Sequence, residues 1–203
     1  MKYLFVILLI QSMTALSQTK DVLIIGNYSP ICFPSDSIVR FHFAQNLPDS
    51  MHKYDGLMLF SGVVSQLSST DIDSIIAFAT RGKGVYCGAE NQPFQEEFNQ
   101  LSNRLFAQEA WGNFTTDEAT LTEKSIIQNA ESKHIYAGET TVAVPFNSKV
   151  KVEAWLENQP LITSYQIGKG MIVFDGGYSR FYCERFTSNQ HIFNSLLESI
   201  LIK

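Results

Sequence analysis

The sequence has few basic residues and no cluster of them. Its 203 residues include 15 Lys or Arg against 20 Asp or Glu, for a formal net charge of −5 at pH 7. Proteins that bind nucleic acids neutralise phosphates with grouped Lys and Arg side chains, so nucleic acid is not an expected partner. A composition of 45% hydrophobic and 17% charged residues predicts a folded domain rather than a disordered chain.

Long hydrophobic runs are also lacking. The apolar run near the start, Tyr3–Ile10, is well short of the about 20 residues that cross a bilayer, which argues against a membrane anchor. Lys2 precedes this run and small residues follow it at the spacing of a signal-peptidase site. We therefore predict a cleaved secretory signal over residues 1–17 and a single domain over 18–203. This domain would be secreted to the periplasm or the extracellular space, with no membrane span after cleavage.

Cysteine and histidine are both scarce and dispersed. No two cysteines have Cys-x-x-Cys spacing and the four histidines are far apart, so the sequence has no local signature of a zinc site, and we expect no metal and no cofactor. In an oxidising compartment an odd number of cysteines predicts one disulfide and one free thiol. The three cysteines are Cys32, Cys87 and Cys183.

Apolar runs in the first half of the chain predict buried strands. The segments 21–28, 54–62 and 84–89 are almost continuously apolar, as strands covered on both faces are. Segment 37–43 alternates between polar and apolar residues, which predicts a half-buried strand.

Helical periodicity separates these runs. After Ser68 or Ser69 as a cap, apolar residues recur at helical spacing until Gly82. A second helix is predicted to start at Asn91, with an apolar stripe from Phe94 to Leu105. Strands that alternate with helices indicate a parallel sheet with crossover connections.

The second half of the chain predicts antiparallel structure. Segments 140–146 and 149–156 are expected strands, and segment 160–177 is expected to form a hairpin that turns at Gly168-Lys169-Gly170. The last fifteen residues predict a helix that packs on the sheet through one apolar face. Trp111 and Trp155 are expected in the core or at an interface rather than as carbohydrate platforms.

Three segments, taken in order, resemble the class I glutamine amidotransferase-like superfamily. They are Tyr54–Gly62, Ile75–Glu90 and Gln159–Phe181, and the last of them is most similar to the non-catalytic and ThuA-like branches. The resemblance implies an α/β flavodoxin-like three-layer sandwich, with a mostly parallel central sheet and an added antiparallel hairpin near the C-terminus.

The resemblance places Cys87 where catalytic members carry a nucleophile on a tight turn from strand to helix. There a helix N-terminus would lower the pKa of the thiol, and the backbone amides of Gly88 and of Ser61-Gly62 would bind an oxyanion. Two features oppose this role. Val85 is bulky for such a turn, and no histidine lies between Met171 and Gln190, where the superfamily carries its base. His134 is the remaining candidate base.

Four further residues are candidates for ligand binding. Asp175 follows the last strand, where ligands bind open α/β sheets, although it could equally cap the strand. Glu90 could be a base or a charge that stabilises the start of a helix. Tyr178 and Arg180 replace the missing histidine and glutamate, and are either ligand contacts or exposed loop side chains. All three cysteines would follow strands of the parallel sheet, so we expect a Cys32–Cys183 disulfide and a free Cys87.

The sequence leaves three functions open. The first is a secreted, non-catalytic amidotransferase-like domain that binds a small molecule or a protein at the carboxyl ends of the parallel strands. The second is a cysteine-dependent hydrolase or amidotransferase that uses Cys87. The third is a ThuA-like protein associated with carbohydrate. The incomplete catalytic set favours the first.

Overall fold

A computed structural model describes most of the chain: residues 19–34, 38–105, 108–116, 118–127, 133–145 and 147–201. The predicted signal segment, residues 1–17, lies outside the described residues.

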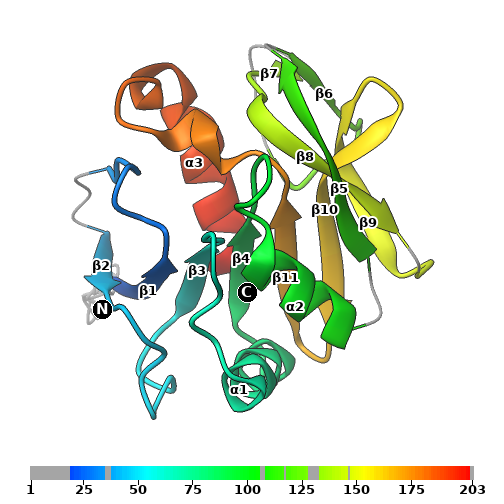
Figure 1. Cartoon of the computed structure of the whole chain (residues 1–203). Helices are drawn as coiled ribbons and strands as arrows, with labels where there is room; N and C mark the ends of the chain where they lie inside the picture. The colour runs from blue at the N-terminus through cyan, green and yellow to red at the C-terminus, as the bar shows by residue number, and fades with distance from the viewer. Residues whose placement is uncertain are drawn as a thin grey trace, which may run out of the picture.

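The structure is an α/β fold built on a nine-stranded mixed sheet (Figure 1). One part of this sheet contains five strands that run parallel to one another. In spatial order they are β2 (Val39–Phe43), β1 (Lys20–Gly26), β3 (Gly56–Phe60), β4 (Gly84–Gly88) and β11 (Gly170–Asp175). Their order confirms the parallel sheet that the alternation of strands and helices predicts.

The antiparallel part is larger than the hairpin expected from the sequence. β10 pairs with β11 through a turn at Gly168, whose φ of +55° suits glycine, and three more antiparallel strands extend the sheet. These four strands are β10 (Gln159–Ile167), β9 (Val150–Leu156), β6 (Ala119–Leu121) and β7 (His134–Ile135). A separate two-stranded sheet contains β5 (Gln108–Thr116) and β8 (Gly138–Pro145).

Three α-helices accompany the sheet in the described part of the chain: α1 (Ser69–Thr80), α2 (Glu96–Arg104) and α3 (Phe186–Leu201). Ser68 caps α1 in a capping box with Asp71, as its sequence predicts. α2 begins at Glu96, and Asn91 does not cap it; the side-chain oxygen of Asn91 instead accepts a hydrogen bond from the backbone of Phe114 at 3.0 Å. A short 3-10 helix, η1 (Tyr178–Phe181), follows β11.

Two hydrophobic cores form on the two faces of the parallel strands. Along β1, Leu23 and Ile25 belong to a cluster with residues of α1 and α2, whereas Val22 and Ile24 belong to a cluster with residues of α3. This alternation follows from the two-residue period of a strand. The same alternation in β4 directs the side chain of Cys87 into the cluster that contains residues of α1 and α2.

Trp111 does not lie in the core. Its side chain on β5 is 57% exposed, and its ring lies 5.9 Å from that of Phe114. Trp155, on β9, is half-buried.

Candidate functional site

A pocket of about 340 Å³ lies at the carboxyl ends of β1 and β3. The connections that leave these two adjacent strands run to opposite sides, since β1 leads to β2 and β3 leads to β4. Such a switch point is where open α/β sheets bind ligands. The pocket is lined by Gly26, Asn27, Gly62, Val63, Val64, Gln66, Phe94 and Glu97.

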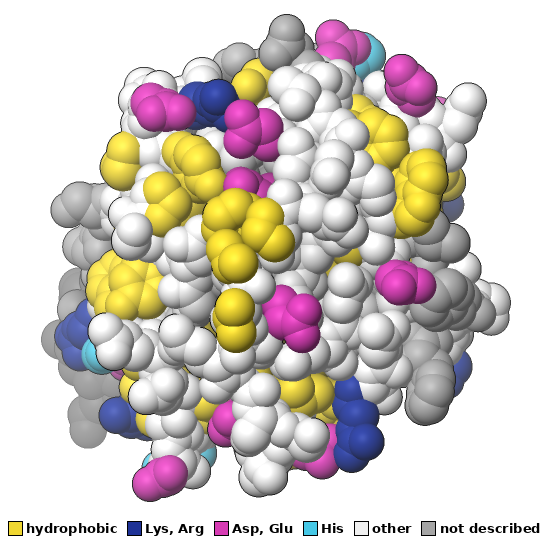
Figure 2. All heavy atoms as spheres, in the orientation of Figure 1, with side chains coloured by type: hydrophobic (Ala, Val, Ile, Leu, Met, Phe, Trp, Pro, Cys, Tyr) yellow, Lys and Arg dark blue, Asp and Glu magenta, His cyan; other side chains and the backbone are white. Residues whose placement is uncertain are grey.

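Apolar side chains surround the opening of this pocket. Val63 and Val64 are 55% and 74% exposed, which is high for β-branched apolar side chains next to one another. Figure 2 shows hydrophobic side chains gathered on this face, over the loops that follow β1, β3 and β4. Solvent-exposed apolar groups beside a pocket are typical of binding surfaces.

Tyr178 holds one wall of the pocket in place. Its hydroxyl donates to the backbone oxygen of Ser61 at 2.8 Å and accepts from the side-chain amide of Asn27 at 3.1 Å. Tyr178 is itself fully buried, so the sequence-based alternative of an exposed loop side chain is wrong. Its role here is to join the loops after β1 and β3 rather than to face solvent.

Glu97 supplies the charged group of the pocket. It lies in the first turn of α2, and its Oε2 accepts a hydrogen bond from the backbone amide of Gly62 at 2.8 Å. Burial raises the pKa of its carboxyl, while hydrogen bonds from the backbone of Gly62 and Gln66 favour the ionised form. A buried carboxylate therefore faces a pocket of ligand size.

Cys87 does not have the surroundings of a nucleophile. It lies inside β4, its side chain is fully buried in the core that contains α1 and α2, and α2 starts only at Glu96. Burial raises the pKa of the thiol well above its usual range, and the nearby charge of Glu97 adds to this effect. Both changes suppress the thiolate on which nucleophilic attack depends.

Two of the backbone amides proposed as oxyanion donors, those of Ser61 and Gly62, are already engaged in hydrogen bonds. The amide of Ser61 donates to the backbone oxygen of Gly88 at 2.8 Å, and that of Gly62 donates to Glu97. The candidate base is distant as well, because His134 lies on β7, five strands along the sheet from β4, and pairs with Glu118. Among the described residues, the candidate donors at Ser61 and Gly62 and the candidate base His134 are therefore not available to Cys87.

Asp175 and Arg180 form a fully buried ion pair behind the carboxyl ends of the strands. The Nη1 of Arg180 donates to Asp175 Oδ2 at 2.9 Å, and the hydroxyl of Tyr86 donates to the same oxygen at 2.9 Å. The other carboxylate oxygen accepts from the backbone amide of Gly177. Asp175 therefore ends its strand by capping a turn, and Arg180 is not an exposed loop side chain.

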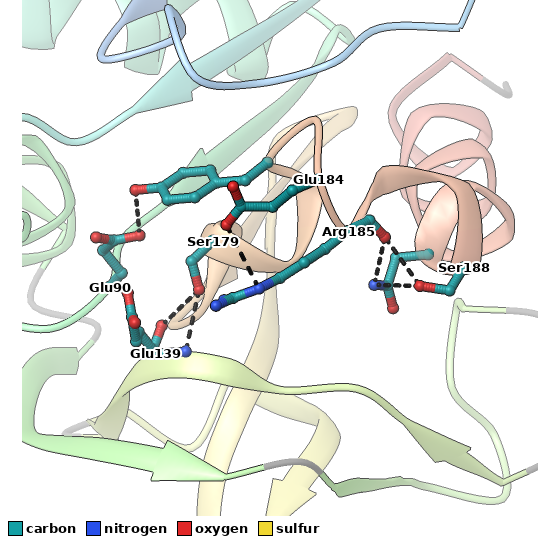
Figure 3. A network of polar contacts seen from close by, with 8 residues as sticks. Glu90, Glu139, Ser179, Glu184, Arg185 and Ser188 are labelled. Carbon is teal, nitrogen blue, oxygen red and sulfur yellow. Dashed lines mark hydrogen bonds and ion pairs between the residues drawn. The ribbon is translucent and has the colours of Figure 1, made fainter.

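Glu90 belongs to a second group of polar side chains near this edge of the sheet. The hydroxyl of Tyr182 donates to Glu90 Oε2 at 2.8 Å. Glu90 also lies near Glu139, at the start of β8, and Arg185, which precedes α3 (Figure 3). Burial raises the pKa of Glu90 to about 7, and α2 is too far along the chain for Glu90 to be a first-turn residue.

The structure contains the Cys32–Cys183 disulfide and leaves Cys87 free. The bridge joins the loop after β1 to the segment after η1, next to an isolated β-bridge between Ile31 and Tyr182. Within the described residues, no group of three or more His, Cys, Asp or Glu side chains is arranged to hold a metal ion. None of the described helices has the length and apolar character needed to cross a membrane.

Sequence reasoning located the edge of the sheet but missed most of the pocket. Of the residues predicted for this site, Gly62 lines the pocket and Ser61 supports it through Tyr178. Asn27 stands at the end of the first apolar run, and this position could have identified it as a residue at the edge of the sheet. Glu97 could not have been identified in this way, because in the sequence it resembles an ordinary charged residue on a helix surface.

Comparisons with known proteins show the fold. No protein-family model matches this sequence, and no curated protein matches it. A cytoplasmic protein from Salmonella typhimurium LT2 matches with a TM-score of 0.64 at 11% identity, over 89% of this chain and 99% of that one. A ThuA-like protein from Bacteroides uniformis matches with a TM-score of 0.54 at 8% identity, over 90% and 92% of the two chains.

A larger enzyme contains a similar unit. The cold-adapted β-galactosidase from Rahnella sp. R3 matches 92% of this chain with a TM-score of 0.61 at 12% identity, and the match covers 32% of that enzyme. At such identities the likeness concerns the arrangement of the chain and not its chemistry.

Proposed function

We propose that this chain is a secreted, non-catalytic, amidotransferase-like domain that binds a small ligand in the pocket between the loops after β1 and β3. The observation that carries the proposal is the position of this pocket at the switch point of the parallel strands. Its volume of about 340 Å³ lies at the lower end of the range of ligand sites, which suits a ligand of small size.

The fold supports the assignment to this superfamily. The order of the parallel strands, β2-β1-β3-β4-β11, corresponds to the flavodoxin-like order, and α-helices pack against both faces of these strands. The likeness to a ThuA-like protein favours the ThuA-like branch. The buried thiol of Cys87 favours binding over catalysis.

Secretion has its own support and its own test. The short apolar run near the start and the Cys32–Cys183 disulfide both fit an oxidising compartment outside the cytoplasm. Mass spectrometry of the protein isolated from its host should give a mature chain that begins at Gln18. A cytoplasmic chain that retains Met1 would contradict this part of the proposal.

A substitution at Gly62 tests the pocket. A Cβ atom at Gly62 would lie 3.7 Å from its nearest backbone neighbour, the oxygen of Val64, and 4.0 Å from Glu97 Oε1, so a side chain fits there and extends beside the pocket. Gly62→Leu should fill the pocket, whereas Gly62→Ala should leave most of it open.

The measurement is ligand-detected NMR with a set of small aromatic compounds of negative, zero and positive charge. We expect some of these compounds to bind the wild-type chain and Gly62→Ala, and to bind Gly62→Leu at least about tenfold more weakly. Circular dichroism melts of the three chains establish that each is folded. Equal binding to all three would place the binding site elsewhere and refute the proposal.

A further inference from the structure

The charges around the pocket have one sign. Among the described residues that line it, Glu97 carries a negative charge and none is Lys or Arg. The remaining polar groups are the amides of Asn27 and Gln66 and the backbone. A ligand that enters the pocket therefore meets a carboxylate without a cationic side chain beside it.

Glu97 is held so that it cannot turn away from the pocket. Its side chain is almost wholly buried, its Oε2 is bound to the amide of Gly62 at 2.8 Å, and its backbone belongs to the first turn of α2. The partial positive charge of a helix N-terminus favours an ionised carboxyl at this position. Because the Glu97 side chain is almost wholly buried, water screens its charge less than that of an exposed carboxylate.

A second carboxyl, that of Glu90, carries part of a negative charge near neutral pH, because burial raises its pKa to about 7. Burial raises the pKa of the Tyr178 hydroxyl, and the negative charges of Glu90 and Glu97 raise it further. That hydroxyl is bound to Asn27, a lining residue of the pocket. Both carboxyls therefore act on the hydroxyl that supports this wall, in a chain whose formal net charge is −5.

Part of the lining is apolar. Val63 and Val64 expose their side chains at the opening, and Phe94, in the segment between β4 and α2, lines the pocket with a half-buried side chain. An aliphatic or aromatic body can pack on these groups, and an aromatic face also attracts cations.

Building on the proposed function, we infer that the ligand of this pocket is a small organic cation: a protonated amine carried on an apolar body. The ammonium pairs with the Glu97 carboxylate, and the body packs on Val63, Val64 and Phe94. An anion of the same shape is repelled by Glu97 and loses its hydration without gaining a partner.

Three compounds with the same phenyl group test the charge preference: phenethylamine, phenethyl alcohol and phenylacetate. Binding is followed by titration of the isotope-labelled chain in NMR, with the amide signals of the pocket residues as the readout. Phenethylamine should bind at least about tenfold more tightly than phenethyl alcohol, and phenylacetate should bind least tightly.

Glu97→Gln should bring the affinity for phenethylamine down to that for phenethyl alcohol, because Gln keeps an acceptor for Gly62 but has no charge. The matched control is Glu96→Gln, which removes the same charge from the adjacent, exposed position of α2 and should leave the preference intact. If Glu97→Gln does not fold, Gln66→Lys places a cation at an exposed polar position of the lining, where the apolar body does not pack, and should weaken amine binding more than alcohol binding.

The outcomes separate this inference from the proposed function. If all three compounds bind at the pocket with similar affinity, or if Glu97→Gln keeps the preference for the amine, the inference is overturned and the pocket remains a ligand site. If none of the three compounds changes the signals of the pocket residues, the inference and the proposed function both fail.

Discussion

Cys87 shows how position in a fold decides what a side chain can do. Its neighbours in sequence, Tyr86 and Gly88, place it near the end of a central strand, which is where the resemblance to class I amidotransferases puts a nucleophile. The structure turns its sulfur into the core that contains α1 and α2, where water does not reach. A thiol in such surroundings behaves as a small apolar group.

Alkylation of the native chain tests this directly. We expect iodoacetamide at pH 8 to modify Cys87 at least about 100-fold more slowly in the folded chain than in guanidinium chloride, because both exposure and thiolate are lacking. Peptide mass spectrometry gives the two rates. In a reduced sample, the exposed Cys183 reports on the reagent, and similar rates at the two cysteines in the folded chain would contradict the prediction.

Glu90 should make stability depend on pH. Its pKa is about 7 in the folded chain and near 4.5 when unfolded, so the folded chain binds more protons between these values. Stability therefore falls as pH rises through this range, by about 1–2 kcal/mol after allowance for partial contact with solvent. The facing groups are the hydroxyl of Tyr182, the carboxyl of Glu139 and the guanidinium of Arg185.

The measurement compares urea unfolding of the wild type and Glu90→Gln at pH 5 and pH 8. Gln can still accept the hydrogen bond of Tyr182 but does not ionise. The free energy of unfolding of Glu90→Gln, relative to that of the wild type, should therefore be about 1–2 kcal/mol higher at pH 8 than at pH 5. Glu198→Gln, on the exposed side of α3, should change nothing. A constant difference between wild type and Glu90→Gln would show that Glu90 titrates normally.

At the scale of elements, α3 packs so close to the start of β4 that there is no room for a side chain at Gly84. A Cβ atom at Gly84 would come within 2.3 Å of the backbone oxygen of Ile200 and 2.4 Å of its Cα. These neighbours belong to the helix backbone and cannot turn aside. Glycine at this position is therefore what lets the last helix cover the sheet.

Gly84→Ala should push α3 away from the sheet and destabilise the chain by about 3 kcal/mol, at the upper end of the usual cost of overpacking. Urea unfolding measures the change. Gly62→Ala is the matched control, since its Cβ meets nothing closer than 3.7 Å, and it should change stability by less than about 1 kcal/mol. Equal effects of the two substitutions would mean that α3 adjusts easily.

The sequence predicts those elements whose signal is local. The buried strands, the capped helix α1, the hairpin at Gly168 and the last helix all have continuous or periodic apolar patterns, and the structure contains each of them. The start of α2 was missed because Asn91 and Phe94 fit a helix pattern, whereas the side chain of Asn91 is used by the distant strand β5. That contact depends on tertiary structure.

The candidate site was harder to predict for the same reason. The buried pair of Asp175 and Arg180, and the pocket that joins Asn27 to Glu97, depend on which strands become neighbours. Short motifs carry no information about these long-range partners. They do place Ser61, Gly88 and Asp175 at the carboxyl ends of β3, β4 and β11, because the order of strand types along the chain fixes where these ends meet.

At the scale of the whole molecule, the Cys32–Cys183 disulfide closes a loop with a sequence separation of 151 residues. A cross-link of this span removes much of the freedom of the unfolded chain, and is expected to contribute about 3–5 kcal/mol. It joins the loop after the first strand to the segment that leads into the last helix.

Thermal unfolding with and without reductant tests this contribution. The reduced chain should melt at a clearly lower temperature, while the paired substitution Cys32→Ser with Cys183→Ser should melt at the reduced value whether or not reductant is present. Identical melting of the oxidised and reduced wild type would show that the bridge does not stabilise the chain.

The same bridge also determines how the chain responds to mechanical force. When force is applied to the two ends of the chain, only the residues before Cys32 and after Cys183 can extend. The segment between the two cysteines stays a closed ring. Four of the five parallel strands and the whole antiparallel extension belong largely to that ring. Full extension of the chain between the two cysteines therefore requires that the bridge be reduced first.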